Sequence, residues 1–349
     1  MIAGRLARPR FFGKREAPRL RPSLLRRLDY VPAGPAMALG MASGALLGGG
    51  LLMATPLAAG AGFVVLLGLA VRLARSGEPI TVIEPATPPQ APEPAPVPPQ
   101  PSRDVAMASI PGGVFSMGSA DAEQGRSADE GPVHAVRVSA FECMRHPVTR
   151  RLYQEVTGND PGWPAGEADE RPVNQVSWYD AVDFCNRLSL RAGLTPCYHI
   201  DANRQVAWNS AADGFRLLTE AEWEYACRAG SSTRYSFGDD ERELERHAWY
   251  AQNAGDSPHP VGRKEPNRWG LYDMHGNVWE WCWDCYAPYS AAAQDNPTGP
   301  SGGKERVLRG GAFHYWAENL RSADRNLGWP EYRSDGIGFR CARGPRRQP

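Results

Sequence analysis

The chain has 349 residues and a formal net charge of zero, from 39 basic and 39 acidic side chains. Because it carries no net positive field, we do not expect nucleic acid or another polyanion as a general partner. All eleven tryptophans lie between Trp163 and Trp329, and all seven cysteines lie between Cys143 and Cys341. Aromatic side chains bury the largest apolar areas, so this region should hold the packed core.

Residues 1–34 form a basic arm. Among the first 27 residues, eight arginines and Lys14 are opposed only by Glu16. Such an arm could bind RNA, but it directly precedes an apolar stretch. That position favours a membrane-flanking role.

Residues 35–75 are predicted to be transmembrane, because no charged residue occurs between Asp29 and Arg72. The apolar run is longer than the roughly 20 residues that one spanning helix needs. It also starts too late and runs too long for a signal peptide. Glycines at 48–50 and Pro56 could break it into a two-helix hairpin.

Positive residues on both sides of this segment favour the hairpin, with both ends in the cytoplasm. A single tilted span is the alternative, and it would place the following domain outside the cytoplasm. We therefore expect a protein anchored in a membrane of the bacterial inner type, with its domain on the cytoplasmic side.

Residues 76–108 are predicted to be a linker, rich in proline between Pro85 and Pro101. A polyproline II run rises about 3.1 Å per residue, so this stretch could hold the domain roughly 50 Å from the bilayer. The alternative is a ligand for proline-binding modules.

Residues 109–345 are predicted to form one irregular, loop-rich α+β domain. One helix should begin at Ser177, because Asp180 follows three residues later and apolar residues then recur at helical spacing. A second should begin at Thr219, with Glu222 completing a capping box, and should end at Gly230.

The other segments of this domain are short, strand-like pieces separated by Gly, Pro, Asn and Asp. The clearest strands are expected at 307–313 and 337–341. A few helices, many loops and numerous tryptophans together indicate an α+β fold in which packing, rather than long regular elements, stabilises the domain.

Cys282-Trp-Asp-Cys285 has the spacing of zinc and redox sites. No second CxxC or His-x-x-x-His pair completes a zinc set, so a structural thiol or disulfide is favoured. Cys185 and Cys227 lie on the apolar faces of the expected helices and should be buried.

The order of motifs along the domain resembles the formylglycine-generating enzyme, or sulfatase-modifying-factor, family. The matching segments are 110–119 (IPGGVFSMGS), 172–181 (PVNQVSWYDA), 215–226 (FRLLTEAEWEYA), 270–281 (GLYDMHGNVWEW), 309–311 (RGG) and 338–340 (GFR). The resemblance implies a fold similar to C-type lectins. Fold alone does not fix chemistry, because the family includes oxidases, sulfoxide synthases, siderophore-maturation enzymes and binding proteins.

In the oxidases, two cysteines follow the Arg-Gly-Gly motif and hold copper(I), an ion that prefers soft thiolates. Here the first of those positions falls on Tyr315, and the second falls on Ala317 or Leu320. No cysteine occurs between Cys285 and Cys341. The resemblance therefore makes copper, and with it formylglycine generation, unlikely for this chain.

A divergent enzyme could use other groups in the same place. The candidate catalytic residues are His314, Tyr315, Glu318 and Asp324. An iron site like that of the sulfoxide synthases is not expected, because the seven histidines form no His-x-x-x-His pair.

The resemblance also implies a structural calcium site formed by Asp273, the carbonyls of Gly276 and Val278, and Glu280. Calcium takes carboxylate and carbonyl oxygens together, so this set has suitable chemistry. The alternative is a tight turn without metal, in which Glu280 caps backbone N–H groups.

Residues 313–337 alternate aromatic and small polar clusters with scaffold-like residues. The predicted ligand contacts are Tyr315, Trp316, Trp329, Tyr332 and Asp335, since rigid aromatic side chains beside adaptable polar ones suit binding. The pattern resembles the ligand-facing segment of lectin-fold proteins diversified by retroelements, although tryptophan is not obtained by mutating adenines of an asparagine codon. The alternative places both tryptophans in the core.

The favoured hypothesis is a membrane-tethered binding or accessory module for a protein or small-molecule ligand, with calcium as a structural ion. The second hypothesis is a divergent enzyme of the family, which includes formylglycine-type oxidation of a protein or small molecule.

Overall fold

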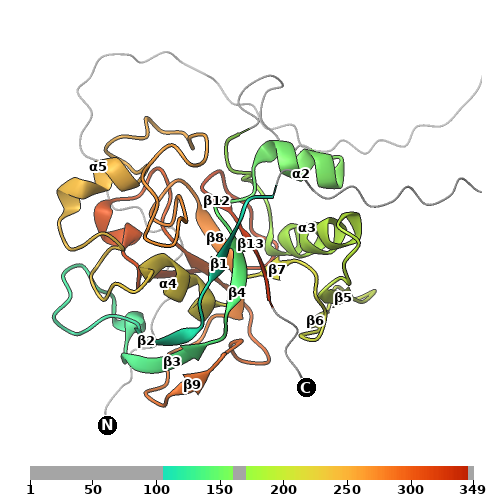
Figure 1. The fold of residues 1–349 in the computed structure, drawn as a ribbon, viewed down its shortest axis with the longest axis horizontal. Helices are drawn as coiled ribbons and strands as arrows, with labels where there is room; N and C mark the ends of the chain where they lie inside the picture. Colours follow the sequence, from blue (N-terminus) through green and yellow to red (C-terminus); the bar gives the residue numbers. More distant parts are fainter. Residues whose placement is uncertain (1–104, 160–169, 345–349) are drawn as a thin grey trace, which may run out of the picture. The chain divides into compact units, whose positions relative to one another are not determined.

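The computed structural model describes residues 105–159 and 170–344 of the chain (Figure 1). The basic arm, the predicted transmembrane segment at 35–75 and the linker up to residue 104 lie outside these residues. Within the described ranges, no helix is long and apolar enough to cross a membrane. Membrane attachment therefore stays a prediction.

The two predicted helices are confirmed, and their caps explain where they begin. Ser177 accepts the N–H of Asp180, and the carboxylate of Asp180 accepts the N–H of Ser177 at 2.7 Å. Thr219 and Glu222 form the second capping box. Two further helices were not predicted. The α-helices of the described residues are α2 (Arg150–Thr157), α3 (Trp178–Arg191), α4 (Glu220–Arg228) and α5 (Leu244–His247). Short 3-10 helices are η1 (Ala128–Glu130), η2 (Glu241–Glu243) and η3 (Ala317–Leu320).

Helix α4 ends one residue earlier than predicted. The left-handed cap is Ala229, with φ of 45°, and Gly230 follows with φ of 88°. All nine residues of α4 are buried. This helix is therefore a central element of the fold, and its charged side chains must be paired inside the protein.

The strands are short and fall into four small sheets. They are β1 (Met107–Ile110), β2 (Gly113–Met117), β3 (His134–Val138), β4 (Phe141–Met144), β5 (Tyr198–Ile200), β6 (Val206–Trp208), β7 (Arg216–Leu217), β8 (Trp279–Cys285), β9 (Gln294–Asp295), β10 (Arg306–Arg309), β11 (Arg325–Gly328), β12 (Ile337–Gly338) and β13 (Cys341–Arg343). The strand orders are β1-β4-β13-β7, β11-β10-β8-β12, β2-β3-β9 and β5-β6. Helices and small sheets together form the mixed α+β architecture that the sequence predicted.

Both strands predicted from sequence are shorter in the structure. Strand β10 ends at Arg309, because Gly310 and Gly311 adopt φ of 101° and 76°, outside the extended region. The 337–341 segment divides into β12, which pairs with β8, and β13, which pairs with β4 and β7 in another sheet. Strand β1 begins at Met107, inside the predicted linker.

Two large apolar clusters flank strand β8. Helices α2 and α3, which lie side by side in Figure 1, pack with Trp279 and Trp281 of β8 in one cluster. Trp223 of α4 packs with residues of β1, β3 and β4 in the other. Because aromatic side chains contribute large buried areas, these clusters supply most of the apolar stabilisation.

Strand β8 also brings the two ends of the 313–337 segment together. Arg309, the last residue of β10, is in register with Glu280, and Ile337, the first residue of β12, is in register with Trp279. The chain therefore leaves β10 and enters β12 at the same end of β8. The segment 313–337, which contains the five predicted ligand contacts, therefore begins and ends at this end of β8.

Candidate functional site

Buried arginine side chains anchor the loops that carry the candidate site. Arg309, Arg321, Arg325 and Arg340 are all at most 1% exposed. Such charges are tolerated inside a protein only when they are paired, and each of the four has a carboxylate partner.

The pairing partners come from distant parts of the chain. Arg321 donates to Glu130 at 2.6 and 2.7 Å, and Arg325 donates to Glu220 at 2.6 and 2.8 Å. Burial by itself would raise the pKa of Glu130, but Arg321 outweighs it and the pKa is lowered. The pKa of Glu220 is likewise lowered, by Arg325 and Arg309 against burial. These ion pairs fix the backbone between Trp316 and Trp329.

Trp316 and Trp329 lie on the surface. Their exposed fractions are 46% and 45%, and every other tryptophan of the described residues is buried or half-buried. The alternative that placed them in the core is therefore wrong. The backbone N–H of Tyr332 donates to the Trp329 carbonyl at 2.8 Å, so a tight turn presents Trp329.

His314 and Tyr315 directly precede Trp316, and both side chains are half-buried. The Tyr315 ring packs edge-on against Trp279, with centroids 5.4 Å apart, and the His314 ring lies 4.7 Å from Tyr315. Gly336 passes close to His314: a Cβ there would lie 2.5 Å from the ring atom Cε1. A larger residue at position 336 would therefore have to displace this ring.

Burial keeps the side chains of His314 and Tyr315 neutral near pH 7. Burial lowers the pKa of His314, with Asp335 and Asp256 opposing it, and burial raises the pKa of Tyr315. The His314 atom Nδ1 is buried and has no hydrogen-bond partner among the described residues. A ligand with a suitable polar group could complete this atom's hydrogen bonding.

Hydrogen bonds from the 172–177 loop hold the backbone at Asp335 in place. Asn174 Nδ2 donates to the Asp335 carbonyl at 2.6 Å, and the N–H of Gln175 donates to the Ser334 carbonyl at 2.9 Å. The carboxylate of Asp335 accepts from Ser334 Oγ at 3.1 Å, and the residue is exposed. The charge of Asp335 is thus available at the surface.

The four catalytic candidates do not converge. His314 and Tyr315 are neighbours, but Asp324 is buried and pairs with Arg321 at 3.4 Å. Glu318 faces the 119–130 region, since its Cβ lies 3.2 Å from where a Cβ on Gly125 would be. The geometry provides no common centre for the four side chains.

Arg340 lies in the middle of the predicted calcium set. The Glu280 carboxylate accepts from Arg340 Nε at 2.7 Å, from Arg340 Nη2 at 2.6 Å and from Trp223 Nε1 at 2.8 Å. Arg340 Nη2 also donates to the carbonyls of Tyr272 and Asp273. The guanidinium thus supplies the positive charge that the sequence analysis assigned to calcium.

The carboxylate of Asp273 also has hydrogen-bond partners within the protein. Its two oxygens accept from the N–H of Gly262 at 2.8 Å and from Asn277 Nδ2 at 3.2 Å. In this arrangement the carboxylates of Glu280 and Asp273 accept hydrogen bonds from protein donors, and the calcium site stays a prediction.

All seven cysteines are buried and free. The CxxC thiols of Cys282 and Cys285 therefore form no disulfide, and burial raises the pKa of Cys282 well above its ordinary value. A thiol that stays protonated is a poor nucleophile and metal ligand. The structural role favoured for this motif agrees with that arrangement.

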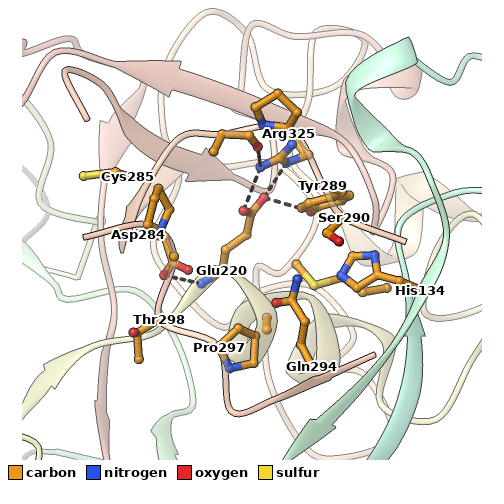
Figure 2. Close-up of a pocket in the computed structure, with 16 residues that line it drawn as sticks. His134, Glu220, Asp284, Cys285, Tyr289, Ser290, Gln294, Pro297, Thr298 and Arg325 are labelled. Carbon is orange, nitrogen blue, oxygen red and sulfur yellow. Dashed lines mark hydrogen bonds and ion pairs between the residues drawn. The ribbon is translucent and has the colours of Figure 1, made fainter. Parts of the chain in front are cut away.

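Sequence reasoning missed a pocket of about 320 Å³ beside the N-terminus of α4 (Figure 2). Its wall includes Asp284, one of the two residues between the cysteines of the CxxC motif. The sequence analysis gave this residue no role. Asp284 is 4% exposed. The one signal of this pocket in the sequence was a charged residue, Asp284, placed between Trp283 and Cys285 in an apolar strand-like segment.

Comparison with known proteins identifies the family to which the chain belongs. Residues 93–345 match the family model described as the sulfatase-modifying factor enzyme 1-like domain. The chain belongs to this family. The resemblance predicted from the motifs is therefore confirmed.

Relatives with several different names match the same region. The formylglycine-generating enzyme of Thermomonospora curvata is 33% identical over 284 residues, which is 68% of this chain and 93% of that protein. Chaperone protein LppX of Paenibacillus barcinonensis is 32% identical over 238 residues, which is 58% of this chain and 78% of that protein.

Solved structures of similar fold also belong to proteins with different names. Treponema denticola variable protein 1 superposes with a TM-score of 0.63 at 34% identity, over 68% of this chain and 95% of that one. PvdO from Pseudomonas aeruginosa superposes with a TM-score of 0.59 at 31% identity, over 68% and 94%. The family thus includes proteins named as enzymes, a chaperone and a variable protein, and the site must discriminate between them.

Proposed function

We propose that this chain is a binding or accessory module of the family, and that its ligand contacts the surface formed by Tyr315, Trp316, Trp329, Tyr332 and Asp335. The observation that carries the proposal is the exposure of Trp316 and Trp329 on loops held by buried ion pairs. Exposed aromatic side chains on a rigid frame lose little conformational entropy on binding and commonly dominate interfaces.

Two further observations support a binding role over the oxidase reaction. No cysteine follows Arg309-Gly310-Gly311 before Cys341, and Cys341 is fully buried. Soft thiolate ligands for copper(I) are therefore missing from this surface. A similarity to a variable protein and to a chaperone is also compatible with recognition of another molecule.

The module is further proposed to be held at a membrane by residues 35–75, with residues 76–104 as the spacer. Fractionation of cells that express the full chain tests this, because a chain with the predicted hairpin should require detergent for extraction. Recovery of the chain in the soluble fraction would refute it.

Binding is tested with a peptide-display library and a glycan array, probed with the full chain in detergent. A ligand selected on the native protein should lose about a hundredfold in affinity when Trp316→Ala and Trp329→Ala are introduced together, since each anchor is worth roughly 1.4 kcal/mol. The matched controls are Val114→Ala and Leu190→Ala, which remove apolar side chains that are 68% and 65% exposed elsewhere.

The two control variants should keep the native affinity. All three variants should unfold within about 1 kcal/mol of the native protein, because the side chains are exposed. Equal affinity in the double tryptophan variant would contradict the assignment of this surface.

A second candidate function is catalysis by a divergent enzyme, favoured by the unpartnered Nδ1 of His314 beside Tyr315. Incubation of the full chain with copper, oxygen and a Cys-x-Pro-x-Arg peptide tests the oxidase form of this candidate. An unchanged peptide mass is expected. Conversion of the thiol to an aldehyde would overturn the binding proposal.

A further inference from the structure

A second site lies away from the aromatic surface, in the pocket beside α4. Its wall is formed by the end of β8, the 286–300 segment, the N-terminus of α4 and single residues of β2, β3 and β11. Figure 2 shows Asp284, His134, Thr298, Gln294, Tyr289 and Arg325 around it. None of the five predicted ligand contacts of the aromatic surface lines this cavity.

The positive charge at this pocket is already neutralised. Arg325 donates to both oxygens of Glu220 at 2.6 and 2.8 Å, and Tyr289 Oη donates to the same carboxylate at 3.0 Å. Arg325 also donates to the carbonyls of Asp129 and Ala287. Four of the five N–H donors of this guanidinium are therefore used, and its charge is paired with Glu220.

Asp284 is the carboxyl group that lacks a cation. Its atom Oδ2 accepts the N–H of Glu220 at 2.8 Å, and no basic nitrogen of the described residues lies within 4 Å of it. Gly299, at φ of 74°, passes against the other side, where a Cβ would lie 3.0 Å from Oδ1. A buried acid without a positive partner is costly unless it is protonated or receives a cation.

Around Asp284, the carboxylates of Glu220 and Glu222 repel its charge, and Arg306 attracts it from beyond ion-pair distance. Burial, with Glu220 and Glu222 adding to it, raises the pKa of Asp284 to about 8. His134, across the pocket, has Nδ1 3.0 Å from the Pro132 carbonyl. Since a carbonyl only accepts, the Nδ1 of His134 donates this hydrogen bond.

We propose that this pocket binds a small organic cation, a guanidinium or ammonium compound, whose charged end pairs with the Asp284 carboxylate. Pro288, Pro297 and Ala221 supply an apolar wall for its carbon skeleton, and Thr298 and Gln294 offer further polar contacts. A metal ion is disfavoured because the described residues contain no cluster of three or more ligands. The volume suits a molecule at the small end of protein ligands.

The test is calorimetric titration of the full chain with benzylguanidine and with benzylurea, its neutral analogue of the same shape. We expect benzylguanidine to bind at least about tenfold more tightly, because only the cation can pair with Asp284. Asp284→Asn should remove this preference while still accepting the Glu220 N–H. The matched control is Asp295→Asn, which changes an exposed carboxylate paired with Arg137 and should leave the preference intact.

Proton release provides a second measurement that does not depend on any variant. At pH 7 a carboxyl group with a pKa of about 8 is roughly 90% protonated, so binding of the cation should release close to one proton. Titrations in buffers of different ionisation enthalpy report that number. Equal affinity for the two compounds, no binding of either, or binding without proton release would each overturn the proposal. Calcium chloride that binds with the same dependence on Asp284 would also overturn it, in favour of a metal.

Discussion

Replacing Glu280 by glutamine tests what stabilises the centre of the domain. The substitution keeps the shape of the side chain but removes the charge that pairs with Arg340, and both residues are at most 1% exposed. Burial opposes the charged form of Arg340, yet Glu280 raises its pKa above the ordinary value. A guanidinium does not lose its proton in proteins, so Arg340 would stay charged in the variant, as a buried cation without its carboxylate partner.

Leaving one member of a buried ion pair unpaired costs about 3–5 kcal/mol of unfolding free energy. For a domain of this size, each kcal/mol corresponds to about 2–4 °C, so the midpoint should fall by roughly 6–20 °C. Thermal unfolding of the full chain, followed by tryptophan fluorescence, measures the shift. The matched control is Glu142→Gln, whose partner Arg343 is 36% exposed, and it should cost less than about 1 kcal/mol.

The same experiment separates the ion pair from the predicted calcium site. If Arg340 is the partner of Glu280, the loss of stability in the variant is the same with calcium and with a chelator. If calcium is the partner, the chelator lowers the midpoint of the native protein to that of the variant. A variant as stable as the native protein in both conditions would refute the ion-pair argument.

Two other predictions follow from buried groups. The sulfur atoms of Cys185 and Cys341 lie 3.6 Å apart, so oxidised glutathione added during refolding should take up their two hydrogens and leave a disulfide, whereas Cys185→Ser should stay reduced. The intact mass checks this, and failure of the native chain to lose two hydrogens would contradict it. Burial lowers the pKa of His275 to about 4 from 6.5, so the unfolded chain binds one more proton between these values. Stability present above pH 6.5 should be lost as the pH falls to 4, by about 3 kcal/mol in urea titrations, and His275→Asn should flatten this dependence; an unchanged slope would contradict it.

Some features of this protein follow from its sequence because they depend on neighbouring residues. Helices α3 and α4 begin where Ser177 and Thr219 meet an acidic residue three positions later. The family motifs and the absence of cysteine between Arg309 and Cys341 are likewise visible in the printed chain. Each of these depends on contacts or patterns within a few positions, which local chemistry determines.

The bounds of the two predicted strands could not be derived from local composition. Residues 307–313 have the composition of a strand, but Gly310 and Gly311 take a left-handed conformation that ends β10. Residues 337–341 have the composition of one strand, yet they serve two sheets. Both outcomes depend on partners elsewhere in the fold, and strand propensity does not encode them.

Only the tertiary structure decided the environment of the charged and aromatic residues. Glu280 pairs with Arg340, which lies 60 positions further along the chain, and Glu220 pairs with Arg325, 105 positions away. The exposure of Trp316 and the isolation of the Asp284 carboxyl are settled in the same way. The physical reason is that burial and charge pairing depend on which distant segments pack together, and a sequence specifies those neighbours only through the complete fold.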